Sequence, residues 1–296
     1  MLAGRFVREQ VTVVEVGPRD GLQNEAVPIP TSVKVAFVNA LSAAGLPFVE
    51  VTSFVNPKAV PQLADAAEVM NTIERRPGTR YPVLVPNERG MDRAVASGVR
   101  DIALFTAATE EFAQANVGTT IGGTFERFAP VISRAKELGI SIRGYVSVAF
   151  GCPYAGDVSP NQALAVGERL LNVGCDDVCF ADTIGVAIPS SVSAVLSASR
   201  DAIPVAMTSL HFHDTNGRAL DNVETGLELG IRRFDAAAGG LGGCPFAPGA
   251  SGNLATERLL AKLTELGMET GVDSAGVYAA VDLLREYVPR LHTSAR

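Results

Sequence analysis

The order of structural elements is clearest in the segment DDVCFADTIGVAIPSSVSAVLSASRDAIPVAMTSLHFH at residues 176–213. Its first part, 176–182, has the short apolar character of a buried strand, and its last part, 205–213, has the same character. Between them, residues 189–201 show the apolar spacing of an amphipathic helix. A strand, a helix and a second strand in this order form the unit from which parallel sheets are built.

The same unit repeats along the rest of the chain. Strands are expected at 11–17, 47–54, 81–86, 101–107, 141–149, 176–182, 205–213 and 233–240. Helices are expected at 31–44, 62–75, 124–138, 160–173, 189–201, 219–229 and 254–266. Several strands follow a glycine that is typical of a helix end, namely Gly45, Gly139, Gly174 and Gly230. Eight repeats predict an α/β fold, a (β/α)8 TIM barrel whose active site lies at the C-terminal ends of its strands.

An open doubly wound sheet is the alternative fold, and it usually carries a G-x-G-x-x-G turn after its first strand. The first expected strand ends instead in GPRDG at 17–21, and the chain has no P-loop. No linker or low-complexity segment divides the 296 residues. We therefore expect one domain over 1–296, with a closing helix in the region 272–296.

Composition narrows the classes of partner. The chain has 25 basic and 32 acidic residues and a net charge of −7, which argues against nucleic acid. No apolar run reaches the ~18 residues of a membrane helix, and the N-terminus lacks the apolar core of a signal peptide. We therefore expect no membrane partner and a cytoplasmic location. Reduced thiols are expected for three of the four cysteines, Cys152, Cys175 and Cys179.

Polar side chains gather at the predicted strand ends, where barrels of this kind hold their chemistry. Those after the first two strands are Arg19, Asp20, Glu50 and Ser53. Those after the last three are Asp182, Thr183, His211, His213, Asp214, Cys244 and Asn253. We expect the catalytic groups to come from this set.

The sharpest local pattern is His211-x-His213, which holds two of the three histidines in the chain. Residues i and i+2 of a strand face the same way, so both imidazoles would point into one space, which suits a shared metal. The alternative is two separately hydrogen-bonded histidines. With Asp20, the site would combine nitrogen and oxygen ligands, which suits Mg²⁺ or Mn²⁺, while imidazole pairs also suit Zn, Fe, Ni or Co.

The lysines argue against a Schiff-base aldolase. None of the four, Lys34, Lys58, Lys136 and Lys262, falls on a predicted strand. A Schiff-base aldolase needs a lysine amine inside the barrel. Metal-assisted chemistry is therefore favoured.

Residues 239–253, GGLGGCPFAPGASGN, are too rich in glycine and proline for a helix or a packed strand. Three interpretations are open: a surface loop that closes the barrel, a lid that carries Cys244 over the site, or a phosphate cradle. Pro245 replaces the third glycine that a cradle would need. The neighbouring strand-end acids and histidines favour the catalytic lid.

Six ordered motifs resemble those of the 3-hydroxy-3-methylglutaryl-CoA lyases, part of the metal-dependent barrel group that includes the isopropylmalate and homocitrate synthases. The motifs are VEVGPRDGLQNE at 14–25, FVEVTSFVNPK at 48–58, RGYVSVAFGCPY at 143–154, ADTIGVA at 181–187, HFHDTNG at 211–217 and GGLGGCPFAPGASGN at 239–253. The resemblance covers residues 5 to 285, and the cysteine-containing loop separates the lyases from the synthases.

The resemblance implies a role for each matching residue. It implies metal ligation by Asp20, His211, His213 and Asn253, and catalytic roles for Arg19, Asp20, Glu50, Asp182, His211 and Cys244. Within these, Arg19 would contact the thioester oxygen and Glu50 would orient Arg19. It implies substrate contacts by Arg19, Ser53, Asn116 and Tyr145.

The implied activity is cleavage of 3-hydroxy-3-methylglutaryl-CoA to acetyl-CoA and acetoacetate, with Mg²⁺ or Mn²⁺, by a homodimer that serves leucine degradation or a ketone-body route. Two alternatives remain. One is a synthase that condenses an acyl-CoA with a 2-oxo acid, which the cysteine loop disfavours. The other is a silent barrel that only binds, which would not need the full set of site groups.

Overall fold

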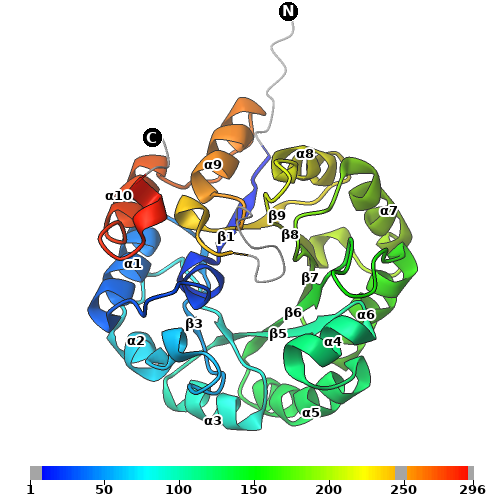
Figure 1. Cartoon of the computed structure of the whole chain (residues 1–296), viewed down its shortest axis with the longest axis horizontal. Coiled ribbons are helices and arrows are strands. Elements are labelled where there is room, and N and C mark those ends of the chain that lie inside the picture. Colours follow the sequence, from blue (N-terminus) through cyan, green and yellow to red (C-terminus); the bar gives the residue numbers. More distant parts are fainter. Residues whose placement is uncertain (1–8, 244–251, 293–296) are drawn as a thin grey trace, which may run out of the picture.

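The computed structural model describes residues 9–243 and 252–292. Its centre is one parallel sheet that curls into a ring inside a layer of helices (Figure 1). The sheet order is β2-β1-β9-β8-β7-β6-β5-β4-β3. The strands are β1 (Thr12–Glu15), β2 (Phe48–Val49), β3 (Thr52–Ser53), β4 (Val83–Leu84), β5 (Asp101–Ala107), β6 (Ser141–Ser147), β7 (Asp177–Asp182), β8 (Thr208–Phe212) and β9 (Arg233–Ala236).

The ring closes through one segment of the chain. β2 pairs with β1 and β3 pairs with β4, and β2 and β3 together occupy the single strand expected at 47–54. The ladder is interrupted at Glu50, whose backbone N–H donates to the carbonyl of Glu15 at 2.8 Å. The nine strands of the described residues are therefore the eight of a barrel, and the prediction of a (β/α)8 TIM barrel is confirmed.

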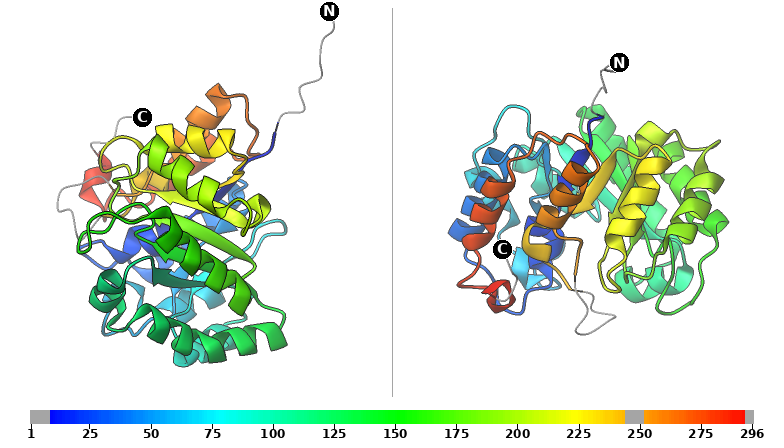
Figure 2. Two further views of the ribbon diagram at one scale, coloured as in Figure 1. Left: turned by 90° about the vertical axis from the view of Figure 1, so that its right-hand side faces the viewer. Right: turned by 90° about the horizontal axis from the view of Figure 1, so that it is seen from above.

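The helices surround the sheet on all sides (Figures 1 and 2). They are α1 (Thr31–Ala43), α2 (Ala66–Thr72), α3 (Glu88–Ala96), α4 (Glu110–Val117), α5 (Ile121–Glu137), α6 (Pro160–Val173), α7 (Pro189–Ser199), α8 (Ala219–Glu228), α9 (Thr256–Glu265) and α10 (Ser274–Asp282). Two of them, α3 and α4, were not expected. α10 packs against α1 in the region where a closing helix is expected. No helix of the described ranges is long and apolar enough to span a membrane.

Local sequence explains where these elements begin and end. Gly174 ends α6 with a φ of 114°, a left-handed conformation that favours glycine. Ser159 and Gln162 form a capping box that starts the same helix. β7 is buried along its whole length, as expected for a strand between the barrel interior and the helices.

The described strands other than β5 are shorter than expected, and three of them begin or end at a local turn. The first strand stops at Glu15 because a π-helical turn, η1 (Gly17–Gly21), begins there. The segment 205–213 begins with a 3-10 turn, η3 (Val205–Met207), after Pro204. The last strand stops at Ala236, before the 3-10 turn η4 (Ala238–Gly240). A proline or glycine lies in or beside each of these turns: Gly17 and Pro18, Pro204, and Gly239 with a φ of 69°.

Candidate active site and metal centre

The turn after β1 places Arg19 and Asp20 at the mouth of the barrel. The carbonyl of Val16 accepts hydrogen bonds from the backbone N–H groups of Arg19 at 3.2 Å and of Asp20 at 2.7 Å, which fixes the turn. All strands are parallel, so residues that follow their C-terminal ends meet at one rim. Asp20 therefore shares the mouth with the residues at the end of β8.

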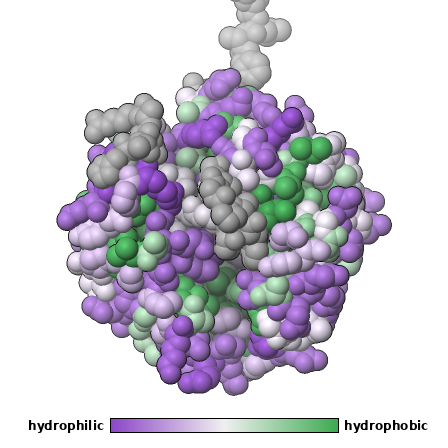
Figure 3. All heavy atoms as spheres, viewed as in Figure 1, coloured by the Kyte–Doolittle hydropathy of each residue, from purple (hydrophilic) through white to green (hydrophobic). Residues whose placement is uncertain are grey.

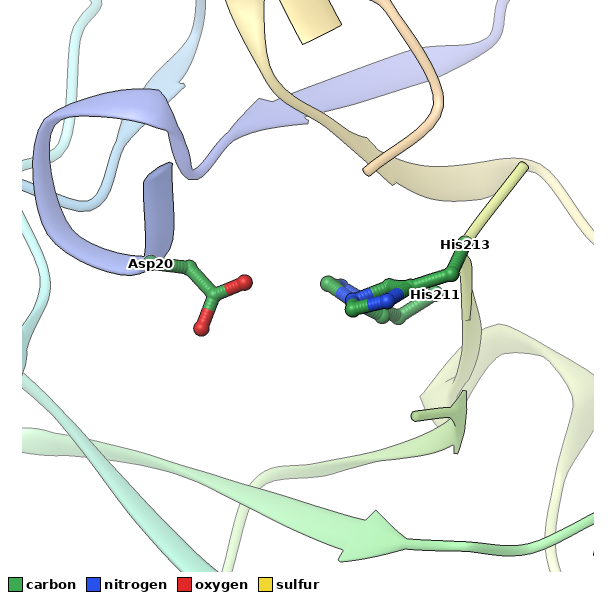
Figure 4. Close-up of side chains that lie close together, drawn as sticks. All are labelled: Asp20, His211 and His213. Atoms are coloured by element: carbon green, nitrogen blue, oxygen red, sulfur yellow. The ribbon is translucent and has the colours of Figure 1, made fainter. Parts of the chain in front are cut away.

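His211 and His213 extend from β8 and face Asp20 across this mouth (Figure 4). Each of these three residues offers a ligand atom, and the three atoms lie within 4.8 Å of one another. The two imidazole centroids are 5.2 Å apart. The shared site expected from the His211-x-His213 spacing is therefore a group that can hold one metal ion.

Asn253 completes the group from the segment before α9. Its Nδ2 donates to Asp20 Oδ2 at 2.9 Å and to the Leu241 carbonyl at 3.0 Å. Its Oδ1 is buried and has no hydrogen-bond partner among the described residues, and the same holds for His213 Nδ1. Unsatisfied buried acceptors are costly in a folded protein, and a divalent cation would satisfy them. The residues present therefore fit a metal ion.

The electrostatics of these groups also suit a cation. Burial, reinforced by neighbouring His211, lowers the pKa of His213 to about 4, so its imidazole is neutral near pH 7. Burial opposes ionisation of Asp20, but Arg19 and the two histidines hold the pKa of its carboxyl well below the usual range. Neutral imidazoles and an ionised carboxylate are the ligand forms that metals bind.

Arg19 is held rigidly beside the metal group. It is 8% exposed and forms ion pairs with Glu50 and Asp20. Glu50 is fully buried, and its second oxygen accepts from the Tyr145 hydroxyl at 2.7 Å. Burial raises the pKa of Tyr145, so its hydroxyl remains a donor. The guanidinium therefore points into the mouth as a fixed positive charge.

A cavity of about 160 Å³ lies between these groups. On the face shown in Figure 3, hydrophobic side chains gather around a hollow near the centre, and hydrophilic ones cover most of the surrounding surface. The cavity lining includes Arg19, Asp20, Gln23, Asn24, Leu84, Phe105, Phe112, Asn116, Tyr145, Ser147, Ala181, Thr183, His211, His213 and Gly243. The mouth can therefore take a polar group of a small molecule next to the metal group.

Comparison with known proteins assigns the family. The HMGL-like family model matches residues 10–284. The chain belongs to the HMGL-like family.

One relative and two solved structures of this family are similar to the chain over most of its length. The chain is 48% identical over 286 residues to the 3-hydroxy-3-methylglutaryl-CoA lyase, cytoplasmic, of Rattus norvegicus, covering 97% of this chain and 83% of the relative. The HMG-CoA lyase structure of Brucella melitensis matches with a TM-score of 0.92 and 48% identity, over 94% of this chain and 98% of that one. An HMG-CoA lyase from Acinetobacter baumannii, in complex with coenzyme A and 3-methylmalate, matches with a TM-score of 0.89 and 38% identity, over 94% and 90%.

Not all predicted site residues of this HMGL-like protein meet in the cavity. Asn116 lines it from α4, a helix that the sequence did not predict. Ser53 is buried and donates to the Leu84 carbonyl at 3.3 Å, and it is absent from the lining. Cys244 lies outside the described residues.

Asp182 also lies outside the cavity lining. Ala181 and Thr183 line the cavity, and Asp182 between them faces the other side of β7. Its two oxygens accept from the backbone N–H groups of Val186 at 2.9 Å and Ala187 at 3.0 Å. Burial raises the pKa of its carboxyl to about 6. In this HMGL-like protein the carboxylate therefore holds the loop after β7, and a catalytic role for it remains a prediction.

Three polar residues of the interior were missed. Gln23 lines the cavity, and its buried Oε1 has no hydrogen-bond partner in the described part of the chain. Asp235 and Arg143 lie below His211, on β9 and β6. The signal that could have found the last two is a charged residue inside an otherwise apolar strand, since such residues are rarely buried without a role.

Proposed function

We propose that the protein is a divalent-metal-dependent lyase that cleaves 3-hydroxy-3-methylglutaryl-CoA to acetyl-CoA and acetoacetate. The observation that carries this proposal is the meeting of Asp20, His211 and His213 within 4.8 Å beside a buried arginine. It is supported by identities of 38% to 48% to three HMG-CoA lyases over most of the chain.

The proposed metal ligands are Asp20, His211, His213 and Asn253. The orphaned Oδ1 of Asn253 and Nδ1 of His213 support this set. The mixture of oxygen and imidazole ligands, with no thiolate among these four residues, favours Mg²⁺ or Mn²⁺. When bound, the ion would lower the pKa of the substrate C3 hydroxyl and align the bond to be broken.

Residues of the chain transfer the proton of the substrate hydroxyl and stabilise the negative charge of the enolate. Asp20 and His211 are the candidate general bases for the proton of the C3 hydroxyl, and Asp20 is favoured because both ring nitrogens of His211 would be engaged, Nδ1 by Asp235 and Nε2 by the metal ion. The electron pair of the C2–C3 bond then passes to the thioester, so acetoacetate leaves and an acetyl-CoA enolate remains. Arg19, fixed by Glu50, stabilises the enolate oxygen. Cys244, which lies outside the described residues, or a neighbouring acid returns a proton to C2.

Further features of the proposal concern binding and assembly. We infer substrate contacts by Arg19, Ser53, Asn116 and Tyr145, of which all but Ser53 line the cavity. An acyl-CoA partner is supported by the coenzyme A in the Acinetobacter baumannii structure. A homodimer, a single domain and a cytoplasmic location also remain proposals, and the relatives include both cytoplasmic and mitochondrial enzymes.

The direct test is product analysis with purified, Mn²⁺-loaded protein and 3-hydroxy-3-methylglutaryl-CoA. We expect acetyl-CoA and acetoacetate in equal amounts, and no cleavage after removal of the metal with EDTA. Cleavage that persists after complete metal removal contradicts the metal-dependent mechanism. Release of free thiol from acetyl-CoA and a 2-oxo acid, without cleavage, indicates the synthase instead.

Substitution of the loop cysteine separates its proposed role from metal binding. In Cys244→Ala we expect a large fall in kcat with an unchanged metal content, because the thiol would move a proton and would not ligate the ion. The measurement is kcat together with metal per protein after dialysis. A variant with normal turnover removes Cys244 from the mechanism.

A further inference from the structure

A buried ion pair lies directly beneath the metal group. Asp235 on β9 is 2% exposed, and its Oδ2 is 3.2 Å from His211 Nδ1. Its Oδ1 accepts from an Arg143 guanidinium nitrogen at 2.7 Å. Neither residue lines the cavity, so neither is placed to touch a substrate. The pair can act on chemistry in the mouth only through the groups that it contacts.

The contact with Asp235 decides how the His211 ring is presented. A carboxylate only accepts hydrogen bonds, so Nδ1 of His211 must carry a hydrogen to bond to it. In the neutral imidazole, the other ring nitrogen, Nε2, then carries no proton and can donate its lone pair to a metal. The ring is also held between Asp235 and the Tyr145 ring, which meets it edge-on at a centroid distance of 6.5 Å.

Arg143 in turn fixes the carboxylate. The same guanidinium nitrogen that binds Asp235 donates to Ser209 Oγ at 2.8 Å, and the guanidinium carbon lies 4.8 Å from the centroid of the Tyr145 ring. Arg143 is 8% exposed, and it offsets the negative charge of Asp235 where water cannot. The guanidinium is therefore a rigid support that keeps Asp235 under His211.

We propose that Asp235, held by Arg143, is a positioning residue that fixes the tautomer and orientation of His211 so that Nε2 faces the metal. Partners of this kind commonly orient metal-binding histidines, and their loss weakens metal binding by about tenfold to a hundredfold. The inference rests on the metal site proposed above. It goes beyond that site by assigning function to two residues that do not reach the ligand.

The binding test uses Mn²⁺ alone as the probe and measures its Kd by titration of the metal-free protein. Asp235→Ala is expected to raise the Kd about tenfold to a hundredfold. Asp235→Asn keeps an acceptor oxygen for Nδ1 and is expected to lose less. An Asp235→Ala variant that is folded by circular dichroism and binds Mn²⁺ like the wild type overturns the proposal.

Asp177→Asn is the matched control. Asp177 is also a buried carboxylate of the barrel interior, and its Oδ2 lies 3.5 Å from Arg143 Nε, but no contact joins it to His211 in the described residues. Removing this charge disturbs the same arginine without touching the histidine. Its Kd for Mn²⁺ is expected to stay within about twofold of the wild type. A loss equal to that of Asp235→Ala contradicts a specific role for Asp235.

A second measurement needs no variant to fold. In metal-free wild-type protein labelled with ¹⁵N-histidine, near pH 8, NMR is expected to show His211 with its hydrogen on Nδ1. A hydrogen on Nε2 overturns the proposal even if all variants fail to fold. Failure of the wild type to bind Mn²⁺, with the Nδ1–H tautomer present, contradicts the metal site and leaves the positioning of His211 supported.

Discussion

The two ends of the barrel differ in how some of their polar groups are partnered. At the N-terminal end of the strands, Arg80 donates to Asp101 at 2.7 Å and Arg233 donates to Asp177 at 2.9 Å. At the C-terminal end, two buried acceptors, His213 Nδ1 and Asn253 Oδ1, have no hydrogen-bond partner among the described residues. The charged pairs named at the N-terminal end are partnered within the chain, whereas these two acceptors at the C-terminal end are available to a ligand that can supply the missing partner.

Arg143 shows that the two ends are connected. Its guanidinium contacts Asp177 toward the N-terminal end of the strands, which we call the base of the barrel, and Asp235 toward the mouth. One side chain therefore links the charge pairs of the base to the metal group. Because the site residues lie at the mouth and the charge pairs lie at the base, we expect substitutions of the site residues to change activity more than stability. We expect substitutions of the charge pairs at the base to do the reverse. The four predictions below test this contrast, from the largest expected effect to the smallest.

His213→Ala tests the mouth most directly. We expect kcat/KM to fall about a thousandfold or more, because the proposed metal ion would lose a ligand and the catalysis that depends on the ion would be lost. The melting temperature of the metal-free protein should change little, since the imidazole Nδ1 makes no hydrogen bond within the described chain. Calorimetry measures the melting temperature, and product analysis measures kcat/KM. A variant that loses stability but still binds metal in its folded fraction would show that His213 serves stability and not metal binding.

Arg19→Met removes the fixed positive charge at the mouth. We expect kcat to fall about a hundredfold to a thousandfold with a much smaller change in KM, because the charge acts mainly on the developing enolate. Steady-state kinetics with 3-hydroxy-3-methylglutaryl-CoA provide the check. A change confined to KM would mean that Arg19 only binds the substrate.

Glu15 lies at the C-terminal end of β1, close to the mouth of the barrel. Its carboxyl group is hydrogen-bonded within the protein, like the charged groups at the N-terminal end of the barrel. It is fully buried and accepts from the backbone N–H groups of Gly17 and Ala238 and from the Thr256 hydroxyl. Burial raises its pKa to about 7, despite the lowering effect of these donors. The carboxyl therefore organises the turn that carries Asp20 without being available to a ligand.

Glu15→Gln should change how stability depends on pH. The folded protein holds the Glu15 proton up to a higher pH than the unfolded chain, so this group lowers the free energy of unfolding as pH rises from about 5 to 7. Glutamine cannot ionise, so the stability of the variant relative to wild type should increase by roughly 2 kcal/mol over that range. Urea unfolding at pH 5 and pH 8 measures it. An identical difference at both pH values contradicts the raised pKa.

Arg233→Ala tests the base. Arg233 pairs with Asp177, stacks near Phe48 at 5.3 Å and has a side chain that is 30% exposed. We expect a loss of about 1 kcal/mol in stability, since partly exposed pairs contribute little. Turnover and the Kd for Mn²⁺ should stay within about twofold of the wild type. A strong loss of activity at unchanged stability would show that the base takes part in catalysis.

The sequence predicts the barrel well because each strand carries its own signal. The segment 101–107 coincides with β5, and the glycines before several strands have the left-handed backbone expected of helix ends, as in Gly45 with a φ of 87°. The break at Glu50 was not predictable, because it arises when the segment 47–54 passes from pairing with β1 to pairing with β4. That change depends on ring closure and not on local sequence.

The site could be predicted from the sequence where the alternation of residues along a strand shows to which face each side chain points. The spacing of His211 and His213 placed both rings in one space, and the turn at 17–21 brought Asp20 to them. The same periodicity turns Asp182 away, because Ala181 and Thr183 face the cavity. Asp235 was missed because its importance comes from β8 and β9 lying side by side, where His211 is paired with it.

Asn253 and Asp20 touch although 233 positions separate them along the chain. The proposed cation site therefore cannot form until all residues from 20 to 253 have been synthesised. Partly made or partly unfolded chains would lack the proposed site, so binding of Mn²⁺ to it would require the completed ring. An ion bound there would connect the first strand of the barrel to the segment after its last strand, and would stabilise the closed ring.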